Sequence, residues 1–363
     1  MRLRSLFLIA AALLALGSCK KQDSFSQTFQ APIGDIRAYY IRLGNNMWCD
    51  WPTQVMGDNL EEAVALLPER KRPDLKLTTV DSLWRKVTDH AAESGINMLV
   101  VDLGEGIQFP SHPELAVEGS WSVEKMRAEI ARLNALGIEV IPKLNFSNTH
   151  NGWMKDYRHM VSSEPYYRMC SEVIADAMEI FGNPRFFHIG FDEEELDNQS
   201  RFSYQVMRVG ESWWQDFLFI ISEVERHGAR AWVWSDRGWH HPDYYERCPK
   251  SVIQQNWYYD GRNGGFDPET NKTIDYDRLM GFWRLEAAGF DQVPCGTNWV
   301  HPVRQQAGMD ADDVIGKLVA TCRKVISKEH LYGFMMAPWS PCTAEGTDFQ
   351  LHGIDLFKEA LAQ

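Results

Sequence analysis

Eight short apolar segments, most of them followed by an amphipathic stretch, constrain the fold of this chain more than any other feature. The apolar segments span residues 36–43, 98–103, 138–144, 186–190, 231–234, 252–255, 292–296 and 332–336. They are nearly continuous in their apolar character and do not alternate with polar residues. This pattern is typical of strands that are buried on both faces of a parallel sheet.

The stretches between these segments have helical periodicity. In residues 78–95, Leu83, Trp84 and Val87 recur at spacings of three and four. In residues 122–137, Ser122 is the expected N-cap and Gly137 ends the helix. Five further helices are predicted at 164–181, 210–227, 275–288, 310–327 and 354–362, whereas the segment after the fifth strand is short.

Strand followed by helix, repeated eight times, predicts a single-domain α/β fold, the (β/α)8 TIM barrel, over residues 35–363. The competing interpretation is an open doubly wound sheet, which favours a glycine-rich phosphate loop after its first strand. Here the first strand is followed by "LGNNMWCDWP", which contains no such loop. The barrel is therefore the preferred prediction.

The N-terminus has the features of an export signal. Arg2 and Arg4 precede an apolar run at residues 6–16, which is too short to span a membrane. The following Leu16-Gly17-Ser18-Cys19 resembles a bacterial lipobox. We therefore expect a lipoprotein signal peptide at 1–18, a tether at 19–34 lipidated at Cys19, and a lipid-anchored location at the bacterial cell envelope. An ordinary secretory signal with an incidental Cys19 is the alternative.

Composition limits the partners. The formal net charge of −13 disfavours nucleic acid, and no basic patch with interleaved aromatic residues is present. The six cysteines after Cys19 form no CxxC motif, and we expect most of them to be free thiols. The adjacent His240 and His241 do not make a metal site, so we expect neither a metal nor a cofactor. The oligomeric state stays open.

The ends of the predicted strands carry a repeated combination of aromatic and polar residues. Chemistry in a TIM barrel is located just after the C-terminal ends of its strands. Tryptophan occurs at six of these eight ends, together with Asp, Asn, Arg and His. Tryptophan faces stack on sugar rings and the polar groups bind hydroxyls, which predicts a carbohydrate pocket, although tryptophans that only plug the barrel are the alternative. The predicted substrate-binding residues are His150, His188, Trp234, Asp236, Arg237, Trp257, Tyr258, Tyr259, Asn298, Trp299 and Trp339.

The four acidic residues at 192–195 indicate which mechanism of glycoside hydrolysis the chain could use. Glycoside hydrolysis needs a proton donor and a second group that stabilises the cationic transition state. The seventh strand segment, "QVPCGTNWVHP", contains no acid that could act as a nucleophile there. The remaining scheme uses the adjacent Asp192 and Glu193 on an N-acetylated sugar whose acetamido group is the nucleophile. Glu194 and Glu195 are expected to face solvent or to lie at a helix N-terminus.

Two segments resemble glycoside hydrolase family 20, the β-N-acetylhexosaminidases. "FHIGFDEE" is similar to its His-x-Gly-Gly-Asp-Glu motif, and "GIEVIPKLNFSNTH" is similar to its third-strand segment. The resemblance implies that Glu193 is the acid/base and that Asp192 orients the acetamido group. It also implies that His150 and His188 support the pair, that Tyr258 or Tyr259 binds the acetamido oxygen, and that tryptophans form the walls, namely Trp257, Trp299 and Trp339.

Several positions depart from that pattern. Phe191 replaces the second glycine, where we expect its ring to reshape the pocket floor, and Lys143 and Asn145 replace two acids of the third strand. We expect Arg42 to be structural and Arg237 to serve as the sugar-binding arginine. Two other functions stay open: a non-catalytic glycan-binding lipoprotein, and a glycosidase that uses other strand-end acids, such as Glu105 and Asp236, on a non-acetylated sugar.

Overall fold

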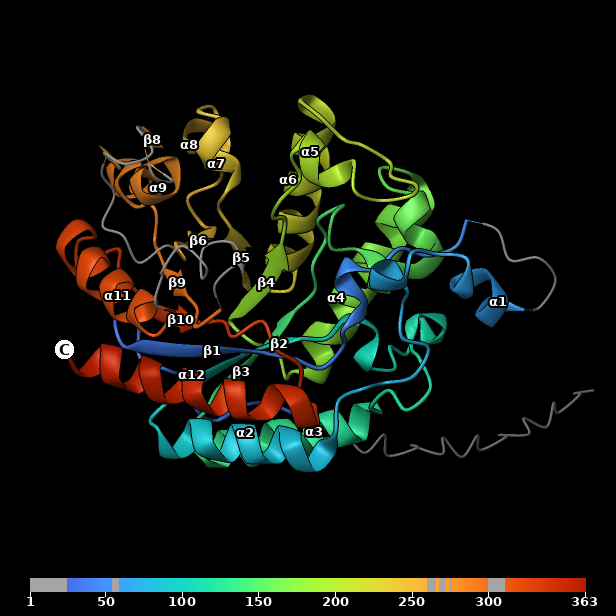
Figure 1. The fold of residues 1–363 in the computed structure, drawn as a ribbon, viewed down its shortest axis with the longest axis horizontal. Helices are drawn as coiled ribbons and strands as arrows, with labels where there is room; N and C mark the ends of the chain where they lie inside the picture. Colours follow the sequence, from blue (N-terminus) through green and yellow to red (C-terminus); the bar gives the residue numbers. More distant parts are fainter. Residues whose placement is uncertain (1–24, 54–58, 260–265, 268–271, 274–275, 300–310) are drawn as a thin grey trace, which may run out of the picture.

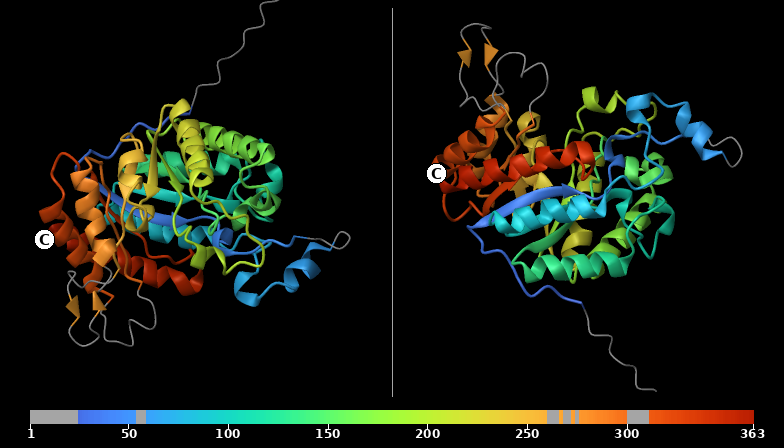
Figure 2. Two further views of the ribbon diagram at one scale, coloured as in Figure 1. Left: turned by 90° about the horizontal axis from the view of Figure 1, so that it is seen from above. Right: turned by 60° about the horizontal axis from the view of Figure 1, so that its bottom comes forward.

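A computed structural model describes residues 25–53, 59–259, 266–267, 272–273, 276–299 and 311–363. Cys19 and residues 1–18 therefore lie outside the described residues. Figures 1 and 2 show parallel strands surrounded by helices. The strands of the main sheet are β1 (Ile36–Arg42), β2 (Met98–Asp102), β3 (Glu139–Lys143), β4 (Phe186–Gly190), β5 (Arg230–Trp234), β6 (Ile253–Gln255), β9 (Cys295–Gly296) and β10 (Gly333–Met336).

The sheet closes into a barrel. The strands pair in the order β6-β5-β4-β3-β2-β1-β10-β9, and every neighbouring pair is parallel. Parallel bridges between Gln254 and Gln292 and between Trp257 and Cys295 join the two ends of this order. The predicted (β/α)8 barrel is therefore confirmed, and each of its eight strands corresponds to one of the apolar segments.

Helices cover the outside of the barrel, as the two views in Figure 2 show. The long ones are α2 (Asp81–Glu93), α3 (Val123–Ala135), α4 (Glu164–Ile180), α6 (Glu211–Arg226), α9 (Tyr276–Ala287), α11 (Asp313–Val325) and α12 (Ala344–Ala362). Only two single-turn helices, α7 (Arg237–His240) and α8 (Tyr244–Arg247), follow β5, in agreement with the weak sequence signal there. Ser122 caps α3 as predicted, because its hydroxyl accepts the N–H of Lys125.

Helix α12 begins ten residues earlier than the sequence pattern predicts, at Ala344 instead of residue 354. Gly346 and Gly353 weaken the helical signal, because glycine is a poor helix former. Gly346 is needed for close packing against the backbone, and Gly353 packs tightly on a side chain. A Cβ at Gly346 would lie 2.3 Å from the carbonyl oxygen of Pro341, and one at Gly353 would lie 3.0 Å from Asn298.

The remaining elements are short and lie around the barrel. They are α1 (Leu60–Ala65), α5 (Leu196–Gln199), the antiparallel hairpin of β7 (Phe266–Asp267) and β8 (Lys272–Thr273), and the 3-10 helices η1 (Asn46–Trp48), η2 (Glu69–Lys71), η3 (Gly104–Gly106), η4 (Pro113–Leu115) and η5 (Gly152–His159). Of the free cysteines, Cys49 is partly exposed and the other five are buried. None of the described helices has the length and apolar character needed to cross a membrane.

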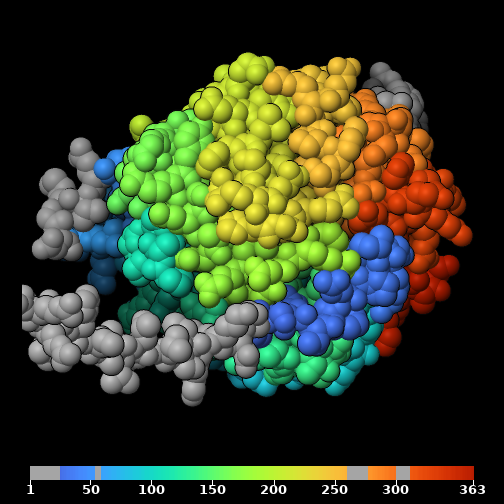
Figure 3. Space-filling model, turned by 180° about the vertical axis from the view of Figure 1, so that it is seen from behind, coloured from blue at the N-terminus to red at the C-terminus, as the bar shows by residue number. Residues whose placement is uncertain are grey.

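The start of the described chain is attached to the barrel end where the strands begin. The Gln27 amide donates to the carbonyls of Val140 and Phe181 and accepts the N–H of Val140. Further along, the N–H of Ala31 donates to Glu139. Figure 3 shows this segment, in dark blue, lying on the surface against green parts of the chain. The sequence predicts a tether over residues 19–34, and within its described part Gln27 and Ala31 are hydrogen-bonded to the barrel.

Candidate active site

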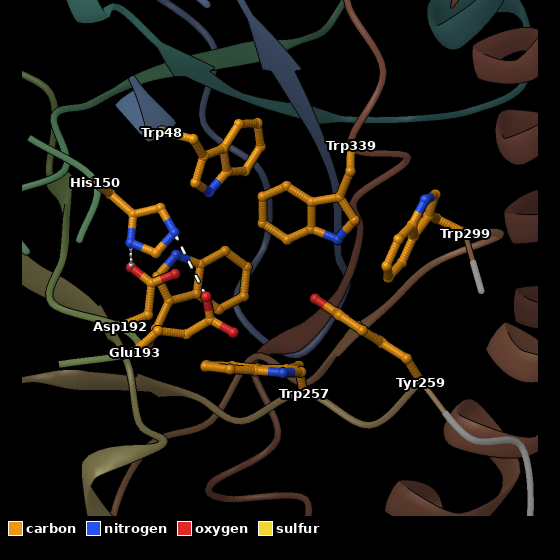
Figure 4. A pocket seen from close by; sticks show the side chains of 9 residues that line it. Trp48, His150, Asp192, Glu193, Trp257, Tyr259, Trp299 and Trp339 are labelled. Atoms are coloured by element: carbon orange, nitrogen blue, oxygen red, sulfur yellow. Dashed lines mark ion pairs between the residues drawn. The ribbon is translucent and has the colours of Figure 1, made fainter. Parts of the chain in front are cut away.

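One pocket lies at the C-terminal end of the barrel, where the strand-end residues meet (Figure 4). Its volume is about 400 Å³, and its lining residues are Trp48, His150, Asp192, Glu193, Trp234, Trp257, Tyr259, Trp299 and Trp339. Eight of these nine were among the predicted site residues. The ninth is Trp48, which lies in η1 directly after the first strand. Because Trp48 follows the end of a strand, the sequence could also have predicted it as a pocket residue.

The aromatic side chains form a connected wall. Trp339 lies with ring centres 5.6 Å from Trp234 and 6.1 Å from Trp48. Trp257 contacts Trp234 at 5.4 Å and Tyr259 at 6.4 Å. Figure 4 shows these rings around the acidic pair. The wall offers several apolar faces to a ligand of the size of one sugar ring.

Asp192, Glu193 and His150 form the polar part of the pocket. His150 lies between the two acids, with Nδ1 3.6 Å from Oδ1 of Asp192 and Nε2 3.7 Å from Oε2 of Glu193 (Figure 4). The Asp192 side chain is 10% exposed, whereas that of Glu193 is 47% exposed. The pair therefore places one nearly buried and one half-exposed carboxylate on either side of the same imidazole ring.

The loop that carries the pair has an unusual backbone. Gly190, Phe191 and Glu193 have φ angles of 72°, 70° and 57° in the left-handed region. The pairing of β4 with β5 also shifts register between His188 and Gly190. A Cβ at Gly190 would lie 2.0 Å from Oδ1 of Asn145, so only glycine fits there.

Phe191 does not form the pocket floor, and the expectation that its ring reshapes the pocket is wrong. The ring is buried against Trp213 and Phe217 of α6, with the Arg208 guanidinium 4.6 Å from the ring centre. Its left-handed backbone explains why glycine suits this position. A non-glycine residue there costs about 1–2 kcal/mol, which the packing of the ring on α6 offsets.

Glu194 is buried, which corrects the expectation that it faces solvent. Its carboxylate receives two bonds from Arg208, with Nη2 at 2.5 Å and Nε at 3.0 Å, and a third from the N–H of Asn148. Arg208 also binds Asp216 and the carbonyl of Phe146. We call Arg208, Glu194 and Asp216 the arginine clamp. It joins the loops after β3 and β4 to α6. Glu195 is half-buried beside His241.

His188 lies inside the barrel below the pocket and does not line it. Its Nδ1 accepts the N–H of Gly190, and its Nε2 donates to Gln255 at 2.8 Å. Burial and the nearby charge of Lys143 hold the pKa of His188 well below its usual value. The ring is therefore neutral, and it supports the end of β4.

Four other predicted binding residues are also outside the pocket lining, and one of them, Asp236, binds the backbone of Glu193 instead. Arg237 lies over the Trp213 ring and 3.6 Å from Glu195. Asn298 donates to the carbonyl of Phe349 and packs against α12. Tyr258 is buried in the core. The assignment of Arg237 as the sugar-binding arginine is therefore not supported by its position.

Arg42 is closer to the pocket than Arg237. It ends β1, lies 4.9 Å from the ring centre of Trp48 and donates to the carbonyl of Trp339. Its Nε is buried and has no hydrogen-bond partner within the described residues. Arg42 therefore supports two pocket tryptophans from behind and, like Arg237, is not among the residues that line the pocket.

The two replacements on β3 have defined partners. Lys143 is fully buried and ion-paired with Asp102, which also accepts the hydroxyl of Tyr40 at 2.8 Å. Asn145 donates from Nδ2 to Oδ1 of Asp192 at 2.8 Å and accepts the N–H of Phe191. Asn145 therefore orients Asp192, and Lys143 and Asp102 neutralise each other inside the barrel.

Glu105 is not in the pocket lining either. Its carboxylate accepts the N–H of Asn45 at 2.6 Å and of Asn46 at 3.1 Å, in the loop after β1. Burial raises its pKa to about 7. No group of three His, Cys, Asp or Glu side chains in the described ranges could hold a metal ion.

The raised pKa of Glu105 predicts a pH-dependent stability. The native state binds this proton more tightly than the unfolded chain, so the free energy of unfolding falls as pH rises from about 4.5 to about 7. For the wild type this decrease in the free energy of unfolding is about 3 kcal/mol across that pH range, and Glu105→Gln should abolish it. Urea denaturation of both proteins at several pH values measures it, with exposed Glu118→Gln as the control. A stability difference between wild type and Glu105→Gln that does not change with pH would contradict the assignment.

Comparison with known proteins gives structural matches only. No protein-family model matches the sequence, and no curated protein sequence matches it significantly. The β-N-acetylhexosaminidase from Bacteroides fragilis is 13% identical with a TM-score of 0.54, over 89% of this chain and 65% of that enzyme. Dispersin B is 16% identical with a TM-score of 0.54, over 78% and 95%. The Streptomyces plicatus N-acetyl-β-hexosaminidase is 13% identical with a TM-score of 0.53, over 91% and 64%.

These matches define the fold class. The chain has the barrel fold of these β-N-acetylhexosaminidases, one of the matches being a family 20 enzyme, and the predicted remote resemblance is confirmed at the level of the fold. It spans just under two thirds of the Bacteroides fragilis and Streptomyces plicatus enzymes.

Proposed function

We propose that this protein is a glycoside hydrolase that removes N-acetylhexosamine residues by a substrate-assisted, retaining mechanism. The observation that carries the proposal is the pair Asp192 and Glu193, on either side of His150 inside an aromatic pocket that is large enough to hold a sugar ring. The structural likeness to family 20 β-N-acetylhexosaminidases supports it.

The geometry suggests a role for each acid. The buried Asp192 carboxylate, oriented by Asn145, would accept the N–H of the substrate acetamido group and turn its carbonyl oxygen toward the anomeric carbon. That oxygen would attack as Glu193 gives its proton to the departing glycosidic oxygen. Glu193 would then take a proton from water, which opens the cyclic intermediate and restores the original anomeric configuration.

The remaining pocket residues would hold the sugar. The faces of Trp234, Trp257 and Trp339 can pack against the acetamido methyl group and the C–H face of the ring. The Tyr259 hydroxyl can donate to the acetamido oxygen, and burial raises its pKa well above the usual value, so it stays protonated. Trp48 and Trp299 can contact the groups that extend from the pocket.

Hydrolysis of a glycoside panel tests the proposal. We expect release of aryl alcohol from N-acetyl-β-hexosaminides and much slower release from the matching glucosides, which lack the internal nucleophile. A thiazoline mimic of the cyclised acetamido group should inhibit competitively. An active enzyme that is insensitive to this mimic would favour a glycosidase using other acids. Sugar binding without turnover would favour the non-catalytic alternative.

A further inference from the structure

Asp236 is a buried acid next to the catalytic pair. It follows β5, is 8% exposed and does not line the pocket. Its Oδ2 accepts the backbone N–H of Glu193 at 2.7 Å. Its Oδ1 is buried and has no hydrogen-bond partner within the described part of the chain. Oδ2 of Asp236 therefore binds the backbone of Glu193, the residue that would donate the proton to the leaving group.

The bond is made where the backbone is strained. Glu193 has a φ of 57°, a conformation that non-glycine residues rarely adopt. The neighbouring strained residue, Phe191, is held through its own N–H by Asn145. For Glu193 the corresponding partner is Asp236. The Glu193 side chain is 47% exposed and its described charged contact is His150 at 3.7 Å, so side-chain contacts alone hold it loosely.

We propose that Asp236 is a positioning residue, whose carboxyl group holds the Glu193 backbone in the left-handed conformation that directs the Glu193 side chain into the pocket. This inference rests on the proposed function for its catalytic consequence, but the conformational consequence is independent of it.

The protonation of Asp236 is consistent with this role. Burial, and then the charge of Asp192, hold the pKa of Asp236 well above its usual value. A neutral carboxyl group keeps a carbonyl oxygen that accepts the N–H and adds no second negative charge beside Asp192. Asparagine presents the same acceptor in nearly the same shape, whereas alanine presents none. The pair of variants Asp236→Asn and Asp236→Ala therefore separates the hydrogen bond from the charge.

The experiment measures kcat for a series of aryl N-acetyl-β-glucosaminides whose leaving phenols differ in pKa. A misplaced proton donor matters most for poor leaving groups. We expect D236A to lower kcat at least about 30-fold for the poorest phenol and less than about threefold for the best. D236N should stay within about threefold of wild type throughout. D291A is the control. Asp291 binds Arg230 at the start of β5, at the other end of this strand from Asp236. This variant should not change how kcat depends on the pKa of the leaving phenol.

Crystal structures of both variants complete the test. We expect Glu193 to leave the left-handed region in D236A and to keep it in D236N. A D236A structure with Glu193 unchanged, or an equal loss for all leaving groups, would overturn the inference. If the wild type hydrolyses none of the substrates, the proposed function fails. The two structures then still decide whether Asp236 holds Glu193.

Discussion

Replacing Glu193 with glutamine should lower kcat on aryl N-acetyl-β-hexosaminides by about 100- to 10,000-fold, the usual contribution of a general acid–base group. Glutamine keeps the size of the side chain and cannot donate a proton to the leaving oxygen. The KM should change little, because the aromatic wall that holds the sugar is intact. The measurement compares steady-state kinetics of the two proteins on substrates with a poor leaving group.

The neighbouring Glu195 supplies the matched control. It belongs to the same acidic run, is half-buried and pairs with His241 outside the pocket lining. Glu195→Gln should keep kcat within about threefold of wild type. Wild-type activity in Glu193→Gln would remove Glu193 from the acid/base role and leave the pocket to the alternative functions.

Replacing Arg208 with methionine should reduce the free energy of unfolding by about 3–5 kcal/mol, because both carboxylates of the arginine clamp would stay buried without a counter-charge. Glu194 and Asp216 have side chains that are 2% and 0% exposed. The loss should be measured by urea denaturation at neutral pH. Activity at a temperature where the variant is folded should also fall, since Glu194 adjoins Glu193.

Arg168→Met is the control for the clamp. Arg168 pairs with Glu164 one helical turn away, and both side chains are mostly exposed. Its removal should cost less than about 0.5 kcal/mol, as is usual for exposed pairs on a helix. If the two variants lost similar stability, the clamp would not hold the loops as inferred.

The barrel could be predicted from the sequence because each strand is buried on both faces. Such strands give apolar runs that are visible without an alignment, as in residues 98–103 and 138–144. The pocket aromatics followed from the same reasoning, since parallel strands place their C-terminal ends together. Trp234, Trp257 and Trp339 meet in space although about 20 to 105 residues separate them in sequence.

The sequence-based prediction was wrong for side chains whose position depends on a distant partner or on an unusual local backbone conformation. Glu194 reads as a surface charge because nothing nearby in sequence neutralises it, yet Arg208 and α6 surround it. The sequence predicts that Phe191 lies in the pocket, but the backbone of this residue has a positive φ and its ring packs against α6. His188 and Asp236 lie at strand ends but serve the backbone of the β4 loop, a role that composition does not reveal.

The attachment of residues 27–31 determines how the molecule would be presented if Cys19 carries a lipid. Gln27 binds at the start of β3, at the end of the barrel opposite the pocket. Only seven residues lie between Cys19 and Gln27, and the eight steps from one to the other span at most about 28 Å when the chain is extended. A membrane anchor would therefore keep the end of the barrel where the strands begin within that distance of the bilayer, and the pocket would lie at the other end. Glycans of the surroundings, and not those of the anchoring leaflet, would have direct access to the pocket.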